Sequence, residues 1–155
     1  MSKPDLLPLS VTHDVRDRCI CLHTQRAARA LARRFDEALA PVNLSSGQFS
    51  LLTSLNRPTP PSIGEVAALL AMDRTTLTAN LKPLARRGLV KVTVDKKDRR
   101  GRHLVLTAAG RRLLVKAVPL WHRAHVELDR QLPRAQMALM RSGLAALGRN
   151  PPAAD

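Results

Sequence analysis

Lys and Arg residues are concentrated between Arg74 and Arg102, where their positive charge is suited to binding a polyanion. The segment holds ten Lys or Arg residues against two Asp residues, so it carries +8 of the chain's net charge of +14. Duplex DNA holds condensed counterions, and each phosphate met by Lys or Arg releases them, which gives salt-sensitive affinity. The segment therefore predicts a surface that binds double-stranded DNA.

A helix that begins after Asp73 must position the first part of this charge. The Asp73 carboxylate is suited to cap the helix N-terminus, and Leu77, Leu81 and Leu84 recur at the spacing of one buried helical face. Gly88 follows the last turn, where glycine accepts a left-handed backbone at least cost. A short helix fits the major groove of DNA, where base edges can be distinguished. The residues that we expect on its solvent-exposed face, at bases or phosphates, are Arg74, Thr75, Thr78, Ala79 and Lys82.

A basic β-hairpin follows this helix directly. Residues 90–94 alternate Val with Lys or Thr, the period-2 pattern of a half-buried strand, and residues 103–106 can form the returning strand after a polar turn. Arginine side chains at the tip of such a hairpin suit the minor groove, whose negative potential attracts guanidinium groups. We expect these contacts to come from Arg99, Arg100 and Arg102.

The composition indicates one mainly α-helical domain that covers residues 1–155. Two Phe, one Trp and no Tyr, with 45% hydrophobic residues, leave a core of Leu, Ala and Val, which suits helices. No apolar run approaches the ~18 residues of a membrane span, and the N-terminus lacks the apolar core of a signal peptide. We therefore expect a cytoplasmic protein with no membrane partner, whose two cysteines are thiols.

Capping patterns and prolines divide the rest of the chain into further helices. The helices that we expect are a long amphipathic one over 13–40, one from Ser45 to about residue 56, a short one after Ser62, and two within 108–148, the first kinked at Pro119. The short helix, a tight turn and the basic helix make a helix-turn-helix unit, and the hairpin makes it a winged helix. The predicted architecture is a winged helix-turn-helix lobe over residues 45–107 together with long terminal helices.

Two stretches of this sequence resemble the MarR family of bacterial transcriptional regulators, and the order of elements is similar over nearly the whole chain. The stretches are MDRTTLTANLKPLARRGLV (72–90) and DKKDRRGRHLVLTAAG (95–110). Asp95, Asp98 and Arg100 fall on the positions of the family's wing signature, which continues into Leu-Thr-x-x-Gly. The resemblance implies that Arg100 enters the minor groove and that Asp98 holds its guanidinium by a charge-assisted bond. Lys96 departs from the pattern, because the family often has proline there.

The resemblance also implies a homodimer, in which helices 13–40 and 108–148 of the two subunits interleave. A two-fold dimer would bind an inverted-repeat operator with half-sites roughly 10 base pairs apart. The expected function is that of a sequence-specific transcriptional regulator, a repressor, that releases DNA when it binds a small aromatic or phenolic effector. The sequence identifies neither the operator nor the regulated genes nor the effector, and it does not separate repression from activation.

By the same resemblance, an effector pocket would lie between the first long helix, the next helix and the helix after the hairpin. The candidate pocket residues are His23, Arg26, Phe49 and Trp121. An arginine there could hold a carboxylate bidentately while aromatic rings stack on the ligand. Each residue also has a structural alternative, since Phe49 and Trp121 suit the core and the two polar residues suit the surface.

Oxidation of a cysteine is the alternative form of control. Cys21 lies 24 residues before Ser45, about where a peroxide-sensing branch of the family places its reactive cysteine, and Arg18 and His23 could favour the thiolate. Against this, the chain has no tyrosine to hold a thiolate, and on one helix Cys19 and Cys21 would point to opposed sides. Packing is the simpler role for a free cysteine.

Other classes of function lack the residues that they need. His122 and His125 share a helical face but have no third and fourth ligands at a suitable spacing, so we expect no metal site. No catalytic constellation or glycine-rich phosphate loop is present, so we expect neither an enzyme nor a cofactor. The remaining alternative from another class is an architectural protein that binds nucleic acid through the same charge without reading sequence.

Overall fold

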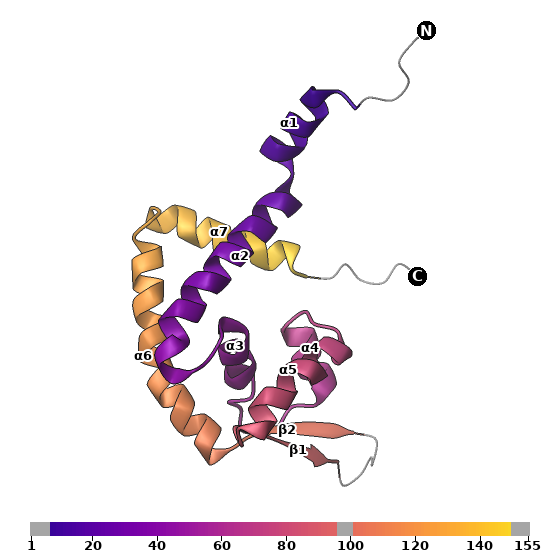
Figure 1. Cartoon of the computed structure of the whole chain (residues 1–155), viewed down its shortest axis with the longest axis vertical. Helices are drawn as coiled ribbons and strands as arrows, with labels where there is room; N and C mark the ends of the chain where they lie inside the picture. The colour runs from indigo at the N-terminus through magenta and orange to yellow at the C-terminus, as the bar shows by residue number, and fades with distance from the viewer. Residues whose placement is uncertain (1–6, 96–100, 150–155) are drawn as a thin grey trace.

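The computed structural model describes residues 7–95 and 101–149, and within these ranges the chain is mainly helical with one β-hairpin (Figure 1). The elements, in chain order, are α1 (Leu9–Arg18), α2 (Ile20–Leu39), the 3-10 helix η1 (Ala40–Val42), α3 (Ser46–Ser54), α4 (Ile63–Leu69), α5 (Arg74–Arg86), β1 (Val90–Val94), β2 (Arg102–Leu106), α6 (Ala108–Asp129) and α7 (Arg134–Leu147). The predicted fold class is confirmed.

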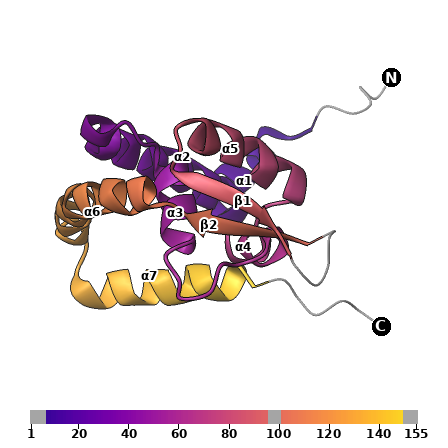
Figure 2. The ribbon, with the colours of Figure 1, turned by 90° about the horizontal axis from the view of Figure 1, so that it is seen from below.

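The short helices and the hairpin gather in one lobe, while the terminal helices extend from it. In Figure 1, α3, α4, α5, β1 and β2 lie together in the lower half, and α2 continues upward into α1 towards the N-terminus. Helix α6 leaves the end of the hairpin and packs along α2. Figure 2 shows α7 running below α3 and α4, set apart from α2. Within the described ranges, no helix combines the length and apolar character needed to span a bilayer.

Side chains at helix starts fix where each element of the lobe begins. Ser45 and Ser62 each form a complete capping box, with Gln48 and Glu65 respectively, before α3 and α4. Asp73 caps α5 and Thr107 caps α6. The predicted helix starts at Ser45, Ser62 and Asp73 are confirmed, and each cap joins residues only three apart in sequence. Gly88, with φ of 70°, supplies the left-handed residue after α5.

The core of the lobe is made of leucine, as the composition predicts. Leu77, Leu81 and Leu84 are buried, so the expected inner face of α5 is confirmed. The residues whose side chains are fully enclosed are Leu39, Leu51, Leu52, Leu77, Leu84, Leu104 and Val66. They come from α2, α3, α4, α5 and β2, so one core joins the hairpin and the helix-turn-helix to the end of α2.

The expected single helix over residues 13–40 is wrong in one respect, because it is divided at Cys19. The backbone of Cys19 is extended, with φ −70° and ψ 103°, and its Sγ accepts a hydrogen bond from the Leu22 N–H at 3.5 Å. Cys19 therefore caps α2 instead of lying within a helix, and the argument that Cys19 and Cys21 point apart on one helix does not apply. Pro119, by contrast, lies inside α6 without dividing it.

Candidate nucleic-acid interface

The outer face of α5 carries the side chains that the sequence placed there. Arg74, Thr75, Thr78, Ala79 and Lys82 are all exposed, opposite the buried leucines. The Thr78 hydroxyl donates a hydrogen bond to the Arg74 carbonyl at 2.7 Å. Its proton is therefore engaged, and its lone pairs remain free to accept from a base or an amino group.

Asp73 holds the start of this helix in place. One carboxylate oxygen accepts from the Thr76 N–H at 2.8 Å, and the other accepts from the Thr76 hydroxyl at 2.6 Å. These bonds, the hydroxyl bond first, keep the pKa of Asp73 below its ordinary value. The first turn of α5, which carries Arg74 and Thr75, is thereby fixed against the α4–α5 turn.

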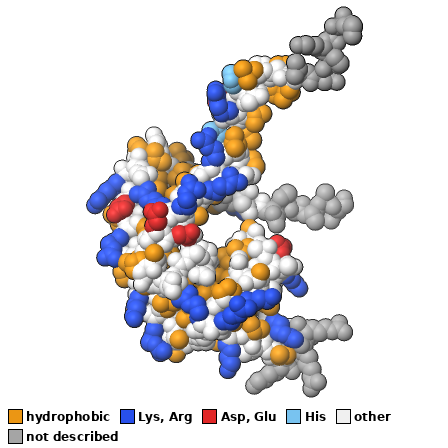
Figure 3. Space-filling model, viewed as in Figure 1, with side chains coloured by type: hydrophobic (Ala, Val, Ile, Leu, Met, Phe, Trp, Pro, Cys, Tyr) orange, Lys and Arg blue, Asp and Glu red, His pale blue; other side chains and the backbone are white. Residues whose placement is uncertain are grey.

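A groove of about 450 Å³ lies between the start of α5 and the end of the hairpin nearest its tip. It is lined by Ser62, Ile63, Gly64, Arg74, Thr78, Gly101 and Arg102. Arg74 and Thr78 of α5 thus face the same space as Arg102 of β2, so the helix and the hairpin present basic side chains on one side of the lobe. On the face in Figure 3, most of the charged side chains of this lobe are Lys or Arg, while most of the visible acidic side chains lie higher, around α2 and α6.

Gly64 makes room for Arg74 in this groove, a contribution that the sequence analysis did not identify. A Cβ atom at Gly64 would lie 3.1 Å from Nη2 of Arg74, closer than ordinary van der Waals contact. A side chain at residue 64 would push the guanidinium away by a few tenths of an ångström, so glycine lets it lie close against the first turn of α4. Its sequence signal was the glycine directly inside a capped helix, where glycine is otherwise unfavourable.

The hairpin has a regular antiparallel register from Val90–Leu106 to Val94–Arg102. The Asp95 N–H donates to the Gly101 carbonyl at 3.0 Å, which continues the ladder towards the tip. Asp98, Arg99 and Arg100 lie outside the described residues, so their contacts with DNA stay predictions. Arg102 is exposed at the start of β2 and stands beside the groove.

His103, near the tip end of the hairpin, ties β2 to the segment that precedes α4. Its Nδ1 lies 3.2 Å from the Pro60 carbonyl oxygen, and its Nε2 lies 3.0 Å from Oδ2 of Asp95. The hydrogen bond to Asp95, followed by that to Pro60, raises the pKa of His103 above its ordinary value. This role could not be predicted from the sequence, because the Pro60 carbonyl that His103 contacts is 43 residues away.

Thr107 and Gly110 seat the hairpin on α6. The Thr107 hydroxyl lies 2.7 Å from the Gly88 carbonyl oxygen and 3.1 Å from that of Leu89, and it accepts from the Gly110 N–H at 3.0 Å. A Cβ atom at Gly110 would lie only 2.3 Å from the Leu89 carbonyl oxygen. The Leu-Thr-x-x-Gly signature therefore encodes a close approach of α6 to the turn between α5 and β1.

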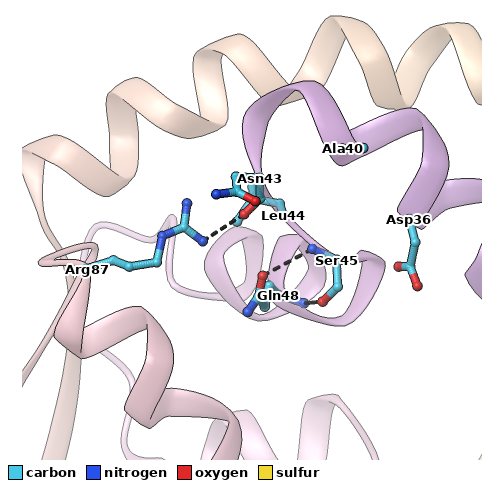
Figure 4. A pocket seen from close by; sticks show the side chains of 7 residues that line it. All are labelled: Asp36, Ala40, Asn43, Leu44, Ser45, Gln48 and Arg87. Carbon is cyan, nitrogen blue, oxygen red and sulfur yellow. Dashed lines mark hydrogen bonds between the residues drawn. The ribbon is translucent and has the colours of Figure 1, made fainter.

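Arg87 joins the end of α5 to Asn43, the residue that follows η1. Its Nη1 donates to the Asn43 carbonyl oxygen at 2.8 Å, across a pocket of about 430 Å³ that Figure 4 shows from close by. In the same pocket, the Asp36 carboxylate accepts from the Ser46 N–H at 2.6 Å. Arg87, although part of the basic segment, thus contributes to the structure of the lobe.

Two of the four candidate pocket residues lie together. The rings of Phe49 and Trp121 are stacked with centroids 6.0 Å apart, and His125 lies 4.3 Å from Trp121 and 4.8 Å from Phe35. Burial lowers the pKa of His125, which favours its neutral form. This aromatic cluster of Phe35, Phe49, Trp121 and His125 joins α2, α3 and α6.

The other two candidates, His23 and Arg26, are exposed near the start of α2. His23 precedes Phe35 by twelve residues, which corresponds to about 18 Å along a helix. Within one subunit the structure therefore brings Phe49 to Trp121 and does not bring His23 to them.

The cysteines and histidines show no assembled site within the part of the chain that is described. Cys21 is exposed, and its Sγ accepts from Nε2 of Gln25 at 3.2 Å. Its role as an oxidant sensor stays a prediction. Among residues 7–95 and 101–149, no three His, Cys, Asp or Glu side chains are placed to hold a metal ion.

A short helix, a turn, an exposed basic helix and a hairpin on the same side define a winged helix-turn-helix protein. Residues 44–101 match the MarR family. The structure is similar to that of the transcriptional regulator MosR of M. tuberculosis in complex with DNA, at 39% identity over 83% of this chain and 96% of that chain, with a TM-score of 0.72. The chain belongs to the MarR family of transcriptional regulators, which are not enzymes.

Two further relatives extend the comparison. The transcriptional repressor CouR bound to a 23-mer DNA duplex is 29% identical over 94% of this chain and 100% of that chain, with a TM-score of 0.79. CouR from Rhodococcus jostii RHA1 bound to p-coumaroyl-CoA is 25% identical, over 87% of this chain and 95% of that chain, with a TM-score of 0.75. The transcriptional activatory protein BadR of Rhodopseudomonas palustris is 33% identical over 89 residues, which are 56% of this chain and 51% of BadR. The chain spans about half the length of the curated relatives it matches.

Proposed function

We propose that this protein is a cytoplasmic, homodimeric repressor that binds an inverted-repeat operator in double-stranded DNA. The observation that carries the proposal is the groove shared by Arg74 and Thr78 of α5 and Arg102 of β2. Helix α5 enters the major groove with Thr75, Thr78 and Lys82 towards the bases, and the hairpin follows the adjacent minor groove. MosR and CouR, both solved with DNA, support this docking.

The terminal helices support the dimer. Helix α1 has ten residues and buries none of them within the subunit, and an isolated helix of that length is marginal in water. Large apolar side chains are exposed along α1, α2, α6 and α7, namely Leu9, Val11, Val15, Ile20, Val115, Val118, Val126, Leu139, Met140, Leu144 and Leu147. We infer that residues 13–40 and 108–148 of two subunits interleave and that the terminal helices, α1 included, bury these side chains against each other, while residues 45–107 bind DNA.

The comparison with two relatives favours repression over activation. CouR is described as a repressor, and this chain covers all of its solved chain. BadR is described as an activatory protein, and this chain covers about half of it. We therefore base the choice between repression and activation on CouR.

A small aromatic or phenolic ligand is the effector that we propose. The aromatic cluster lies where α3 of the lobe meets α2 and α6, so a ring inserted beside Phe49 and Trp121 would move the lobe against the terminal helices. CouR, solved with p-coumaroyl-CoA, supports an aromatic ligand. The distance between the two α5 helices of a dimer must match the spacing of the half-sites. A ligand that moves the lobes changes this distance and so releases the DNA.

Binding to the DNA upstream of the protein's own gene tests the proposal. At one fixed salt concentration, the affinity for this DNA should exceed the affinity for random duplex, and hydroxyl-radical footprinting should give two symmetric protected patches roughly 10 base pairs apart. An affinity ratio near one would favour the architectural alternative, and a single unrepeated patch would exclude the dimeric operator. Addition of phenolic acids should release the DNA, whereas release by organic hydroperoxide alone would point to Cys21.

A further inference from the structure

Both ring nitrogens of His103 face oxygen atoms that can only accept hydrogen bonds. Nδ1 lies 3.2 Å from a backbone carbonyl oxygen, that of Pro60, and Nε2 lies 3.0 Å from a carboxylate oxygen, that of Asp95. A neutral imidazole carries one N–H, so one of the two contacts would set a lone pair against an oxygen. Only the imidazolium, with two N–H donors, satisfies both partners at once.

The charges around His103 favour this protonated form. Asp95 at the end of β1 is its direct ion-pair partner, with both side chains about one-third exposed at 31% and 32%. Glu65 in the first turn of α4 adds a second negative charge, and its own pKa is held low by hydrogen bonds from Ser62. Among the described residues, Arg57 is a cation that acts on Glu65, and Arg102 is the neighbour of His103 in β2.

The contacts of His103 join two parts of the DNA-facing surface. Next to it, the Leu104 N–H donates to the Pro61 carbonyl oxygen at 2.9 Å, and His103 forms a β-bridge with Ser62. Ser62 is the N-cap of α4 and lines the groove with Arg74 and Arg102. We call the two side-chain contacts of His103, with Asp95 and Pro60, the His103 clamp. Together with the two backbone contacts, this clamp sets the position of β2 relative to the helix-turn-helix.

We propose that His103, as an imidazolium, is the positioning residue of the hairpin, and that its deprotonation loosens the hairpin and weakens binding to DNA. The inference deepens the proposed function and rests on it. The clamp is complete at pH values below the ordinary histidine pKa of about 6.5. It is lost as pH rises through the raised pKa of His103, so affinity for DNA falls in that window.

The free full-length protein gives the first test, which needs no DNA. In an NMR titration, the His103 ring signals should report a pKa above the ordinary value of about 6.5, and Asp95→Asn should lower it. The hydrogen-exchange protection factor of the Leu104 amide should fall in the same pH window as His103 loses its proton. A His103 pKa at or below the ordinary value would overturn the clamp.

DNA binding gives the second test. At fixed salt, the affinity of the wild-type protein for its operator should fall several-fold as pH rises through the measured pKa of His103. His103→Gln, whose single amide cannot reach both acceptors, should bind several-fold more weakly at the acidic end and show no such fall. The control is His13→Gln, on an exposed histidine of α1, which should keep the wild-type pH profile.

The two tests separate failure of this inference from failure of the proposed function. If wild-type protein shows no preference for its upstream DNA, the proposed function fails, and the NMR titration and Leu104 exchange still decide whether the clamp exists. If operator binding is specific but His103→Gln has the same pH profile as the wild type, the positioning role of His103 is overturned.

Discussion

The winged-helix lobe and the terminal helices use leucine in opposite ways. In the lobe, Leu77, Leu84 and Leu104 are fully enclosed by side chains of the same subunit. In α7, Leu139, Leu144 and Leu147 are 73%, 45% and 67% exposed, and Met137 is the one residue of that helix that is buried. One subunit therefore closes the core of the winged-helix lobe by itself, whereas its terminal helices leave apolar surface exposed, which the proposed dimer would cover.

The largest contrast between the two regions should come from leucine truncation. We expect Leu77→Ala to lower the free energy of unfolding by about 2–5 kcal/mol, because it leaves a cavity in a closed core. Leu144→Ala should change the unfolding of dilute subunits little, but it should raise the dimer dissociation constant. Denaturant unfolding and analytical ultracentrifugation measure the two effects, and an equal loss of monomer stability in both variants would remove the contrast.

Two glycines of the terminal helices allow a matched test, because Gly110 at the start of α6 packs against the lobe and Gly143 in α7 does not. Gly110→Ala should destabilise the protein by about 1–3 kcal/mol, because its Cβ would approach the Leu89 carbonyl oxygen. Gly143→Ala in α7 has no atom within 4 Å of the added Cβ, so it should be neutral or stabilise the helix by up to about 1 kcal/mol. Thermal unfolding of the two variants measures the difference, and stability equal to the wild type in Gly110→Ala would contradict the close approach.

Lysine substitutions should separate the regions by their contribution to DNA binding. Lys82→Ala on α5 should weaken binding without unfolding the lobe and reduce the slope of log affinity against log salt by about 1. Lys116→Ala, also exposed but on α6, serves as the control and should leave the slope unchanged. Fluorescence anisotropy at several salt concentrations gives both slopes. Equal slopes in the two variants would exclude Lys82 from the interface.

Local hydrogen bonds explain why much of the fold could be predicted. Ser45, Ser62, Asp73 and Thr107 each bond to a backbone N–H three residues later, so the sequence window that predicts the cap contains the whole interaction. The inner face of α5 follows in the same way from the spacing of its leucines. The exposure of Arg74, Thr78 and Lys82 was therefore predictable before any tertiary contact was known.

Contacts between distant segments explain most of what the sequence did not predict. His103 depends on Pro60, and Arg87 depends on Asn43, which is 44 residues away. The break at Cys19 was missed for a different reason, since the amphipathic pattern continues across it and cysteine is not among the favoured capping residues. The pairing of Phe49 with Trp121 was implied by the family resemblance and not by the spacing of the two residues.

The division at Cys19 gives the N-terminal arm a mechanical freedom that an unbroken rod would lack. A single residue with extended backbone separates α1 from α2, so a rotation about one bond there swings all ten residues of α1 together. At 1.5 Å per residue α1 is about 15 Å long, so a swing of about 20° displaces its far end by about 5 Å. Such a change at Cys19 would move α1 relative to α2 without altering the helical backbone that begins at Ile20.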